Sequence, residues 1–372
     1  MTFKCQPKRL EGPGPYIAKL KDKKYKFNEA YSFLLLSSQT IFDRKKKVEL
    51  KKMASKRYSY FKSLKCLILN VLNLSVLQRL RIAVITGGNK GVGLEICRQM
   101  ANEVVVVLTA RDEQRGVDAV AKLHSSGLQD VVFHQLDVTD PSSIASLANF
   151  IDARFGKLDI LVNNAGISST IVDEESFWSI DLPSEVLVGK TKQSKKAVTQ
   201  TFEGAQNCLE TNYYGAKHVT QALLALLLKS TSPKIVNVSS KLGQLQNVQD
   251  ENARKILSDV DGLTEEVVDE VVSEYLKDVK DEESMVKKGW SSNVSGYIVS
   301  KAALNAYTRI LAKEFPSISA NAVSPGFVAT DMTYFKGTST VEEGARGPVR
   351  LALISDAGPT GQYFWTTEKS TF

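Results

Sequence analysis

The sequence predicts an α/β fold built around a doubly wound parallel sheet. Short apolar runs rich in β-branched residues, such as 82–86 and 234–238, alternate with longer segments of helical apolar spacing. A glycine-rich turn at 87–93 directly follows the first run and opens a helical pattern. Strand, turn and helix in this order begin a Rossmann-type unit, in which ligands lie at the carboxyl ends of the strands. We therefore expect a single domain of this type over 81–372.

The basic residues of the chain are concentrated near its start. Residues 1–80 carry 19 Lys and Arg against 5 Asp and Glu, a net charge of +14, whereas 81–372 carry 29 against 36, a net charge of −7. The larger part is mildly acidic, so we expect no nucleic-acid partner. Four cysteines and three histidines are scattered without metal-ligand or disulfide spacing. We expect no metal site and a reducing compartment, the cytoplasm.

The segment 1–80 fits no clean targeting or membrane pattern. Its apolar run, 66–77, is interrupted by Asn70, Asn73 and Ser75. A transmembrane helix needs about 20 apolar residues, so this run is too short to span a bilayer. We expect a basic extension that is disordered or an artefact of the gene model. Attachment to a membrane surface through 60–80 remains an alternative.

The first strand and its glycine turn predict a dinucleotide-binding site. Glycines let the backbone approach a pyrophosphate, and the N-terminus of the following helix offers free N–H groups. The candidate residues of this turn are Gly87, Asn89, Lys90, Gly91, Val92 and Gly93. A second strand, 104–108, is followed by Arg111. A guanidinium there, with Lys90 in the turn, suits a 2′-phosphate and favours NADP(H) over NAD(H), although Asp112 argues the other way.

Two further strands bring more candidate residues to the same edge of the sheet. The run 131–136 leads into Asp137 and Val138, after which Asp140 is the expected N-cap of a helix. A fourth run, 158–162, ends in Asn163, followed by three more cofactor-binding candidates: Asn164, Ala165 and Gly166.

The second half of the chain carries the candidate catalytic residues. A predicted helix over 207–228 contains Asn212, and the strand 234–238 is followed by Ser239 and Ser240, between which the residues alone do not decide. Tyr297 and Lys301 are four positions apart at the start of a segment with helical spacing, so their side chains share one face. A fixed ammonium beside a tyrosine favours the phenolate, so we expect Lys301 to lower the pKa of Tyr297 towards neutrality.

A last predicted strand, 320–323, precedes a loop that completes the set. Its cofactor-binding candidates are Pro325, Gly326, Val328 and Thr330. The final segment, 361–364, is expected to be an edge strand.

These motifs, taken in order, resemble the short-chain dehydrogenase/reductase family over about 81–372. The residues 86–99 and 108–112 are similar to those of a plant branch that contains neomenthol/menthone reductases and salutaridine reductase, with animal carbonyl reductases as more distant relatives. Residues 53–58 resemble the short N-terminus that this branch places before its first strand, which supports the artefact hypothesis for the extension.

The resemblance implies roles for individual residues. It selects Ser240 over Ser239 as the catalytic serine, and it makes Tyr297 the proton donor. Lys301 would also hold the nicotinamide ribose, as a cofactor-binding residue like Tyr297, and Asn212 would position a water that links Lys301 to solvent. The loop from Pro325 would cover the nicotinamide, with Thr330 at its carboxamide and Val328 packing through its backbone.

Two insertions distinguish the chain from simple members of the family. We name residues 244–290 the flap; an apolar stripe from 267 to 279 and an acidic opposite face (Asp269, Glu270, Glu274, Asp278) predict that it contains a helix. The stripe could pack on the core or form a lid over the substrate, and the resemblance implies the lid and a monomer. The insertion 168–196, with Phe177, Trp178, Leu182 and Leu187, is placed to add an apolar wall.

We expect an NADP(H)-dependent reductase of an apolar ketone, such as a monoterpenoid or alkaloid ketone. A broad reductase that detoxifies aldehydes and quinones is an alternative. A non-catalytic dinucleotide-binding protein is another, although all four candidate catalytic positions are present.

Overall fold

The computed structural model describes residues 81–178, 197–355 and 358–372. Residues 81–372 form one compact unit. The expected extension 1–80 and the positions Leu182 and Leu187 lie outside the described residues.

Within the described ranges, the main sheet has eight strands in the order β10-β9-β8-β7-β4-β1-β2-β3. The strands are β1 (Ile82–Ile85), β2 (Val105–Ala110), β3 (Val131–Gln135), β4 (Ile160–Asn163), β7 (Lys234–Val238), β8 (Ser319–Ser324), β9 (Gln362–Trp365) and β10 (Glu368–Ser370). All neighbours pair in parallel apart from β9 and β10, which are antiparallel. The doubly wound fold is therefore confirmed.

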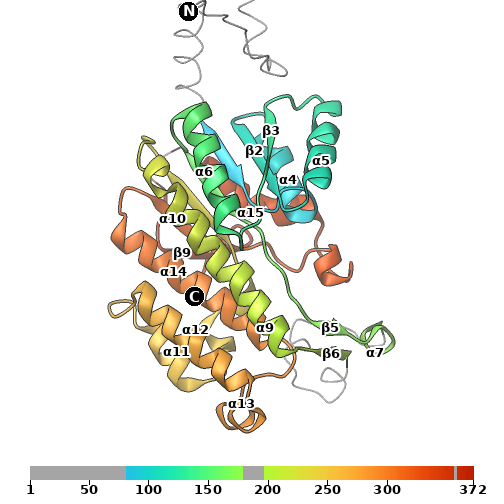
Figure 1. The fold of residues 1–372 in the computed structure, drawn as a ribbon, viewed down its shortest axis with the longest axis vertical. Coiled ribbons are helices and arrows are strands. Elements are labelled where there is room, and N and C mark those ends of the chain that lie inside the picture. Colours follow the sequence, from blue (N-terminus) through green and yellow to red (C-terminus); the bar gives the residue numbers. More distant parts are fainter. Residues whose placement is uncertain (1–80, 179–196, 356–357) are drawn as a thin grey trace, which may run out of the picture. The chain divides into compact units, whose positions relative to one another are not determined.

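The strands form where they do because both faces of the sheet are covered. Every residue of β1, β4, β7 and β8 is buried, as expected for parallel strands with helices on either side. Helices α4 (Gly91–Met100) and α15 (Val341–Leu353) pack together on one face, whereas α6 (Pro141–Phe155), α10 (Gly215–Leu227) and α14 (Ser295–Glu314) lie on the other (Figure 1). Asp140 caps α6 as predicted, accepting from the Ser142 N–H at 2.9 Å.

The structure corrects two boundaries. The helix expected over 207–228 begins earlier, as α9 (Phe202–Leu209), and continues through a π-helical turn, η2 (Glu210–Tyr214), into α10. The expected edge strand near 361–364 is β9, which lies between β8 and β10; among the described strands, β10 forms that edge.

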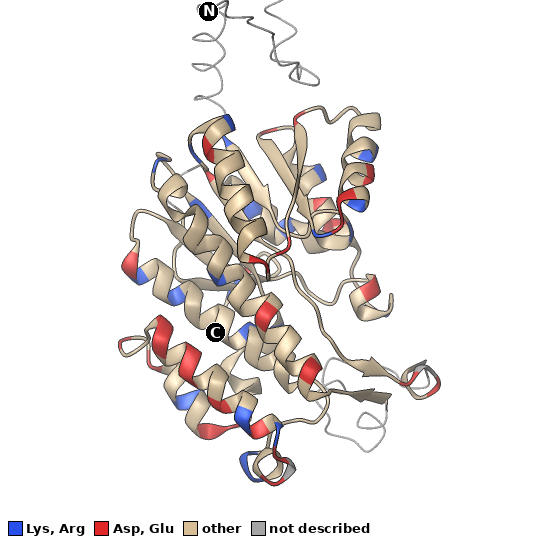
Figure 2. Cartoon of the chain, in the orientation of Figure 1, with Lys and Arg blue, Asp and Glu red and all other residues tan. Residues whose placement is uncertain are grey.

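The flap is helical, with η4 (Leu245–Asn247), α11 (Glu251–Ser258), α12 (Glu265–Val279) and α13 (Glu282–Lys288). Thr264 caps α12, and the apolar stripe of this helix is buried at Val268, Val271, Val272 and Tyr275. Helix α12 packs against α9 and α14. Figure 2 shows Asp and Glu gathered on α11 and α12.

Two of the four residues on the predicted acidic face of α12 make contacts with other parts of the protein. Asp278 is 6% exposed and accepts hydrogen bonds from Lys288 and from the Trp290 indole N–H. Asp269 accepts from the Tyr213 hydroxyl at 2.7 Å and from Lys217 at 2.8 Å. These carboxylates connect the flap to itself and to the sheet domain.

No helix in the described part of the chain combines the length and the apolar composition that crossing a bilayer requires.

Candidate active site

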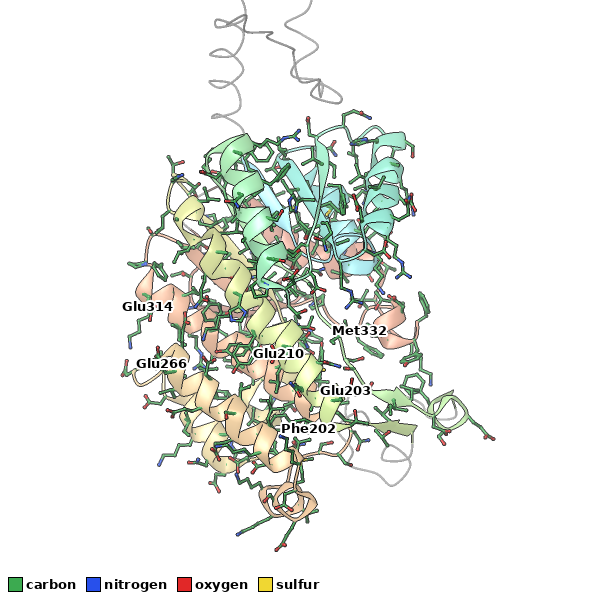
Figure 3. The ribbon with its side chains drawn as sticks, viewed as in Figure 1. Phe202, Glu203, Glu210, Glu266, Glu314 and Met332 are labelled. Carbon is green, nitrogen blue, oxygen red and sulfur yellow. The ribbon has the colours of Figure 1, made fainter. Side chains whose placement is uncertain are left out.

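A cavity of about 1130 Å³ lies at the carboxyl ends of the parallel strands. The structure places every predicted cofactor-binding residue on its wall, together with Ser240, Tyr297 and Lys301. Asn212 is the one predicted site residue that does not line it. Figure 3 labels two further lining residues, Glu210 of η2 and Met332 of η5 (Asp331–Thr333), which reach the cavity from different segments.

The glycine turn at the end of β1 has the shape that a bound phosphate group requires. Gly87 and Gly91 have φ values of +64° and +54°, which other residues rarely adopt. A Cβ on Gly93 would lie 2.3 Å from the Gly87 carbonyl oxygen, so only glycine allows this close packing. The following helix, α4, has no side-chain cap at Lys90. Gly91, Val92 and Gly93, the first residues of α4, line the cavity, and the N-terminus of a helix is suited to bind the pyrophosphate of a dinucleotide.

Thr86, which the sequence analysis did not select as a site residue, holds two of the predicted residues in place. Its hydroxyl accepts from the backbone N–H groups of Asn164 and Ala165, both at 2.9 Å. The Asn164 side chain donates in turn to the Thr86 carbonyl at 2.9 Å. Asn164 and Ala165 thus shape the cofactor wall through the backbone as well as lining it.

The end of the cavity near β2 is basic. Arg111 and Arg115 both line it, and Arg115 was missed by the sequence analysis. Asp112 is the N-cap of α5 (Glu113–Ser125) and accepts from the Arg115 N–H at 2.9 Å. Its other oxygen lies 3.9 Å from the Arg115 Nε, so Asp112 contacts both the backbone and the side chain of Arg115. Lys90 forms an ion pair with Asp331 across the cavity, so its charge is partly neutralised.

The candidate catalytic side chains meet at the centre of the site. Tyr297 and Lys301 lie on α14, and Ser240 follows β7. Ser240 and Tyr297 both line the cavity, and the Ser240 side chain is near enough to Tyr297 to lower the pKa of its phenol. Lys301 is 4% exposed, and its Nζ donates to the Val238 carbonyl oxygen at 2.8 Å. Ser239 instead donates its hydroxyl to Asn305 at 2.7 Å, away from this group, which agrees with the choice of Ser240.

Asn212 does not line the cavity but contacts residues close to it. It is 1% exposed and lies in the π-helical turn η2, a feature that is often found at functional sites. Its Nδ2 donates to Ile167 O at 2.9 Å and to Ser300 Oγ at 3.0 Å, and its Oδ1 accepts from the Ile167 N–H at 2.8 Å. The side chain therefore joins the backbone of Ile167 to the Ser300 hydroxyl of α14.

The electrostatics of the pair differ from the expectation. Tyr297 is half-buried at the cavity wall, and its desolvation raises its pKa to about 12 against the opposing effect of Ser240, so the expected lowering of this pKa is wrong. Burial also lowers the pKa of Lys301 to about 8. The physical reason is the same for both groups, because a buried environment disfavours whichever form carries the charge.

The predicted loop after β8 closes one side of the cavity. Gly326 has φ +89°, and Val328 forms a parallel bridge with Ser339. Thr330 comes next to the glycine turn, since a Cβ on Gly91 would lie 3.4 Å from its Cγ2. Val328 and Thr330 both line the cavity, and their contacts with the nicotinamide stay a prediction.

The remaining wall combines apolar and polar side chains. Its apolar and aromatic residues are Ile167, Val172, Phe177, Val198, Leu242, Val294, Phe327, Met332 and Tyr334. The Phe177 and Tyr334 rings lie 5.1 Å apart, so the insertion 168–196 contributes the expected apolar wall through Phe177. No residue of η4 or α11–α13 is among the described lining. The structure therefore favours core packing over a lid for the flap.

Comparison with known proteins identifies relatives for almost the whole described unit. Residues 81–252 match the family described as short chain dehydrogenase, and 278–350 match a family described as enoyl-(acyl carrier protein) reductase. Salutaridine reductase from Papaver bracteatum is 49% identical over 302 residues, which are 79% of this chain and 97% of the relative. Carbonyl reductase [NADPH] 1 from Mus musculus is 36% identical over 296 residues, 76% of this chain and 95% of the relative.

A solved structure shows the same fold. Menthone neomenthol reductase from Mentha piperita superimposes with a TM-score of 0.68 at 44% identity, covering 78% of this chain and all of that one. These relatives show that the chain belongs to the short-chain dehydrogenase/reductase family and is an oxidoreductase that uses a nicotinamide dinucleotide.

Proposed function

We propose that the protein is an NADPH-dependent reductase of apolar ketones, with Ser240, Tyr297 and Lys301 as its catalytic residues. The observation that carries this proposal is that Ser240, Tyr297 and Lys301 line the same cavity as the glycine turn of the cofactor site. A cavity in which two hydroxyl groups lie near apolar side chains suits a carbonyl compound.

The chemistry follows from these side chains. The bound nicotinamide would supply the hydride. Ser240 and Tyr297 hydrogen-bond the carbonyl oxygen where negative charge develops, and Tyr297 gives it a proton. Because the pKa of Tyr297 is raised to about 12, its phenol is protonated at neutral pH and ready to act as the acid. Lys301, when protonated, stabilises the phenolate that remains.

Asn212 is proposed to support this group. Its side-chain contacts fix Ile167 and Ser300, and Ser300 donates to the carbonyl oxygen of Tyr297 at 2.8 Å. The water that the resemblance implies next to Asn212 stays a prediction.

NADP(H) is the proposed form of the cofactor. Arg111 and Arg115 provide two guanidinium groups at the wall beyond β2, and such groups bind phosphate well. Asp112, the residue that could bind a ribose hydroxyl instead, uses an oxygen to cap α5. The name of the mouse relative also specifies NADPH.

A monoterpenoid or alkaloid ketone is the proposed substrate class. The apolar wall around Phe177 and Tyr334 suits a rigid apolar molecule. The relatives are named for salutaridine and for menthone and neomenthol, which are an alkaloid and monoterpenoids.

The test is NADPH oxidation by the purified full-length protein with menthone, a bulky alkaloid ketone, a reactive aldehyde and a quinone. We expect turnover of at least one apolar ketone, preference for NADPH over NADH, and loss of turnover in Tyr297→Phe with cofactor binding retained. Faster turnover of the aldehyde and quinone would indicate a detoxifying reductase. Tight NADPH binding without any turnover would indicate a binding protein.

We also propose a cytoplasmic monomer. Support for the monomer comes from α12, which covers α9 and α14. Light scattering of the purified protein would test it, and a dimer mass would contradict it.

Cell fractionation would test the proposed compartment. Peptide mass spectrometry of the native protein would test the proposal for 1–80, since abundant peptides from 10–50 would exclude a gene-model artefact.

A further inference from the structure

The first turn of α14 carries Tyr297 and has no cap of its own. The helix begins at Ser295, so Tyr297 is its third residue, and its N-cap residue, Val294, makes no side-chain cap hydrogen bond. The first N–H groups of a helix need partners from elsewhere. Here Gln200 supplies one, because its Oε1 accepts from the Gly296 N–H at 3.0 Å.

The contact between Gln200 and this turn is close. A Cβ on Gly296 would lie 2.3 Å from Gln200 Nε2 and 2.8 Å from Ala205 Cα, so this approach requires glycine. The Gln200 backbone is fixed as well, since its N–H donates to the Ser292 carbonyl at 3.1 Å. Gln200 is thus held on both its backbone and its side chain.

The flap adds a second support through Tyr275 of α12. Its hydroxyl is buried and hydrogen-bonds Ser295 Oγ at 2.9 Å, and Gln200 Nε2 donates to the same hydroxyl at 3.4 Å. The Tyr275 ring packs edge-on against Trp290, with centroids 5.0 Å apart. Both residues that precede Tyr297 in α14 are therefore held by side chains from outside the helix.

Gln200 also connects this turn to the substrate wall. It directly follows β6 (Val198–Thr199), which pairs with β5 (Ile171–Val172). Val198 and Val172 both line the cavity. Because Gln200 contacts the first turn of α14 and directly follows β6, a displacement of β6 at the cavity wall would also displace the contact that holds this turn.

We propose that Gln200 and Tyr275 are positioning residues for Tyr297. They hold the first turn of α14 so that the Tyr297 hydroxyl meets Ser240, and they make the apolar wall and the flap part of that alignment. This inference rests on the proposed function of Tyr297 as the proton donor.

The experiment combines kinetics with an NMR signal that needs no turnover. The full-length protein is labelled with 13Cζ-tyrosine, and the Tyr297 signal is assigned by its loss in Tyr297→Phe. Gln200→Leu removes both hydrogen bonds at similar size, and Gln200→Glu keeps an acceptor for the Gly296 N–H. Tyr275→Phe removes only the hydroxyl. Gln206→Leu, at an exposed position of α9, is the matched control.

We expect Gln200→Leu to shift the Tyr297 signal and to lower kcat about tenfold, which corresponds to about 1.4 kcal/mol, with an unchanged Kd for NADPH. Gln200→Glu should recover much of this loss, and Tyr275→Phe should shift the signal in the same sense with a smaller fall in kcat. If Gln200→Leu does not fold, Tyr275→Phe decides. A Tyr297 signal and a kcat that match those of Gln206→Leu would overturn the proposal. If the wild type reduces no ketone, the proposed function fails, while the NMR comparison still shows whether these residues position Tyr297.

Discussion

The ammonium group of Lys301 lies 5.8 Å from the centre of the Tyr297 ring, and both groups have pKa values shifted by burial. The shifts run in opposite directions, Tyr297 up to about 12 and Lys301 down to about 8. Of the two, Lys301 is therefore the one that titrates closer to neutral pH. The pH dependence of the enzyme is expected to follow Lys301.

Ketone reduction is expected to lose rate above about pH 8. The kcat/KM profile reports the free enzyme, in which Lys301 gives up its proton near this pH while the Tyr297 phenol keeps its own. Without the ammonium, the phenolate left after proton transfer is less well stabilised. Steady-state rates from pH 6 to 11 would measure this fall in kcat/KM. The pKa obtained from it is an apparent value for the coupled pair of Tyr297 and Lys301. A rate that stays constant from pH 8 to pH 11 would contradict the prediction.

Replacing Lys301 by Met should stabilise the protein while abolishing turnover. The pKa of Lys301 is about 8 in the folded chain and 10.5 as the ordinary value. The unfolded chain therefore binds this proton more strongly, and at neutral pH the difference costs the folded state about 3 kcal/mol. Loss of the hydrogen bond to Val238 offsets about 1 kcal/mol of the gain. A net increase of about 2 kcal/mol in the free energy of unfolding is expected at pH 7.

The same comparison has a pH signature. Wild-type stability rises relative to Lys301→Met between about pH 8 and 10.5, because Lys301 becomes neutral in the folded state first. Urea unfolding of both proteins at pH 7 and pH 10 would measure this change. The difference in their free energies of unfolding should be smaller at pH 10. Lys255→Met, at an exposed lysine of α11, is the control and should show no such narrowing. A less stable Lys301→Met at pH 7 would refute the desolvation argument.

Arg111 and Arg115 should determine the preference for NADPH. Each guanidinium that contacts a 2′-phosphate contributes a charge-assisted hydrogen bond, so Arg111→Ala or Arg115→Ala should lower kcat/KM for NADPH about tenfold. The value for NADH should hardly change, and the loss should diminish at high salt. Lys122→Ala, an exposed charge change on the same helix α5, controls for net charge. Equal losses with both cofactors would show that these residues do not read the phosphate.

The comparison of sequence with structure shows where periodicity is informative. The strands β1, β4, β7 and β8 lie within two residues of their predicted positions, because buried parallel strands consist of short β-branched runs that differ from their surroundings. The residues predicted after these strands line the cavity, because parallel strands bring their carboxyl ends to the same edge of the sheet.

The misses have a common physical origin in tertiary contacts. Arg115 lies in the first turn of α5, and its place on the cavity wall depends on how this helix packs in the fold, which no motif marks. The pKa of Tyr297 depends on how deeply the fold buries it, which the spacing to Lys301 does not contain. The helical pattern placed Asp269 on the acidic face of α12 but did not show its partners, Tyr213 and Lys217, which are more than fifty positions away.

That buried contact supplies the last prediction, which concerns the stability of the flap. Asp269 of α12 accepts from the fully buried Tyr213 hydroxyl and from Lys217, which also pairs with Glu265 at 3.1 Å. Asp269→Leu would leave the Tyr213 hydroxyl without this acceptor and Lys217 with one carboxylate fewer. Because Asp269 is itself partly exposed, the expected loss in the free energy of unfolding is about 1–3 kcal/mol rather than the larger cost of a fully buried pair.

Urea denaturation measures this loss as a lower midpoint with an unchanged slope. Glu270→Leu, the neighbouring exposed carboxylate on α12, is the control and should change stability by less than about 0.5 kcal/mol. Combining Asp269→Leu with Tyr213→Phe should cost less than the sum of the two, since the second change removes the hydroxyl that the first one strands. Equal midpoints for Asp269→Leu and Glu270→Leu would mean that apolar packing of Val268, Val272 and Tyr275 alone holds the flap on the domain.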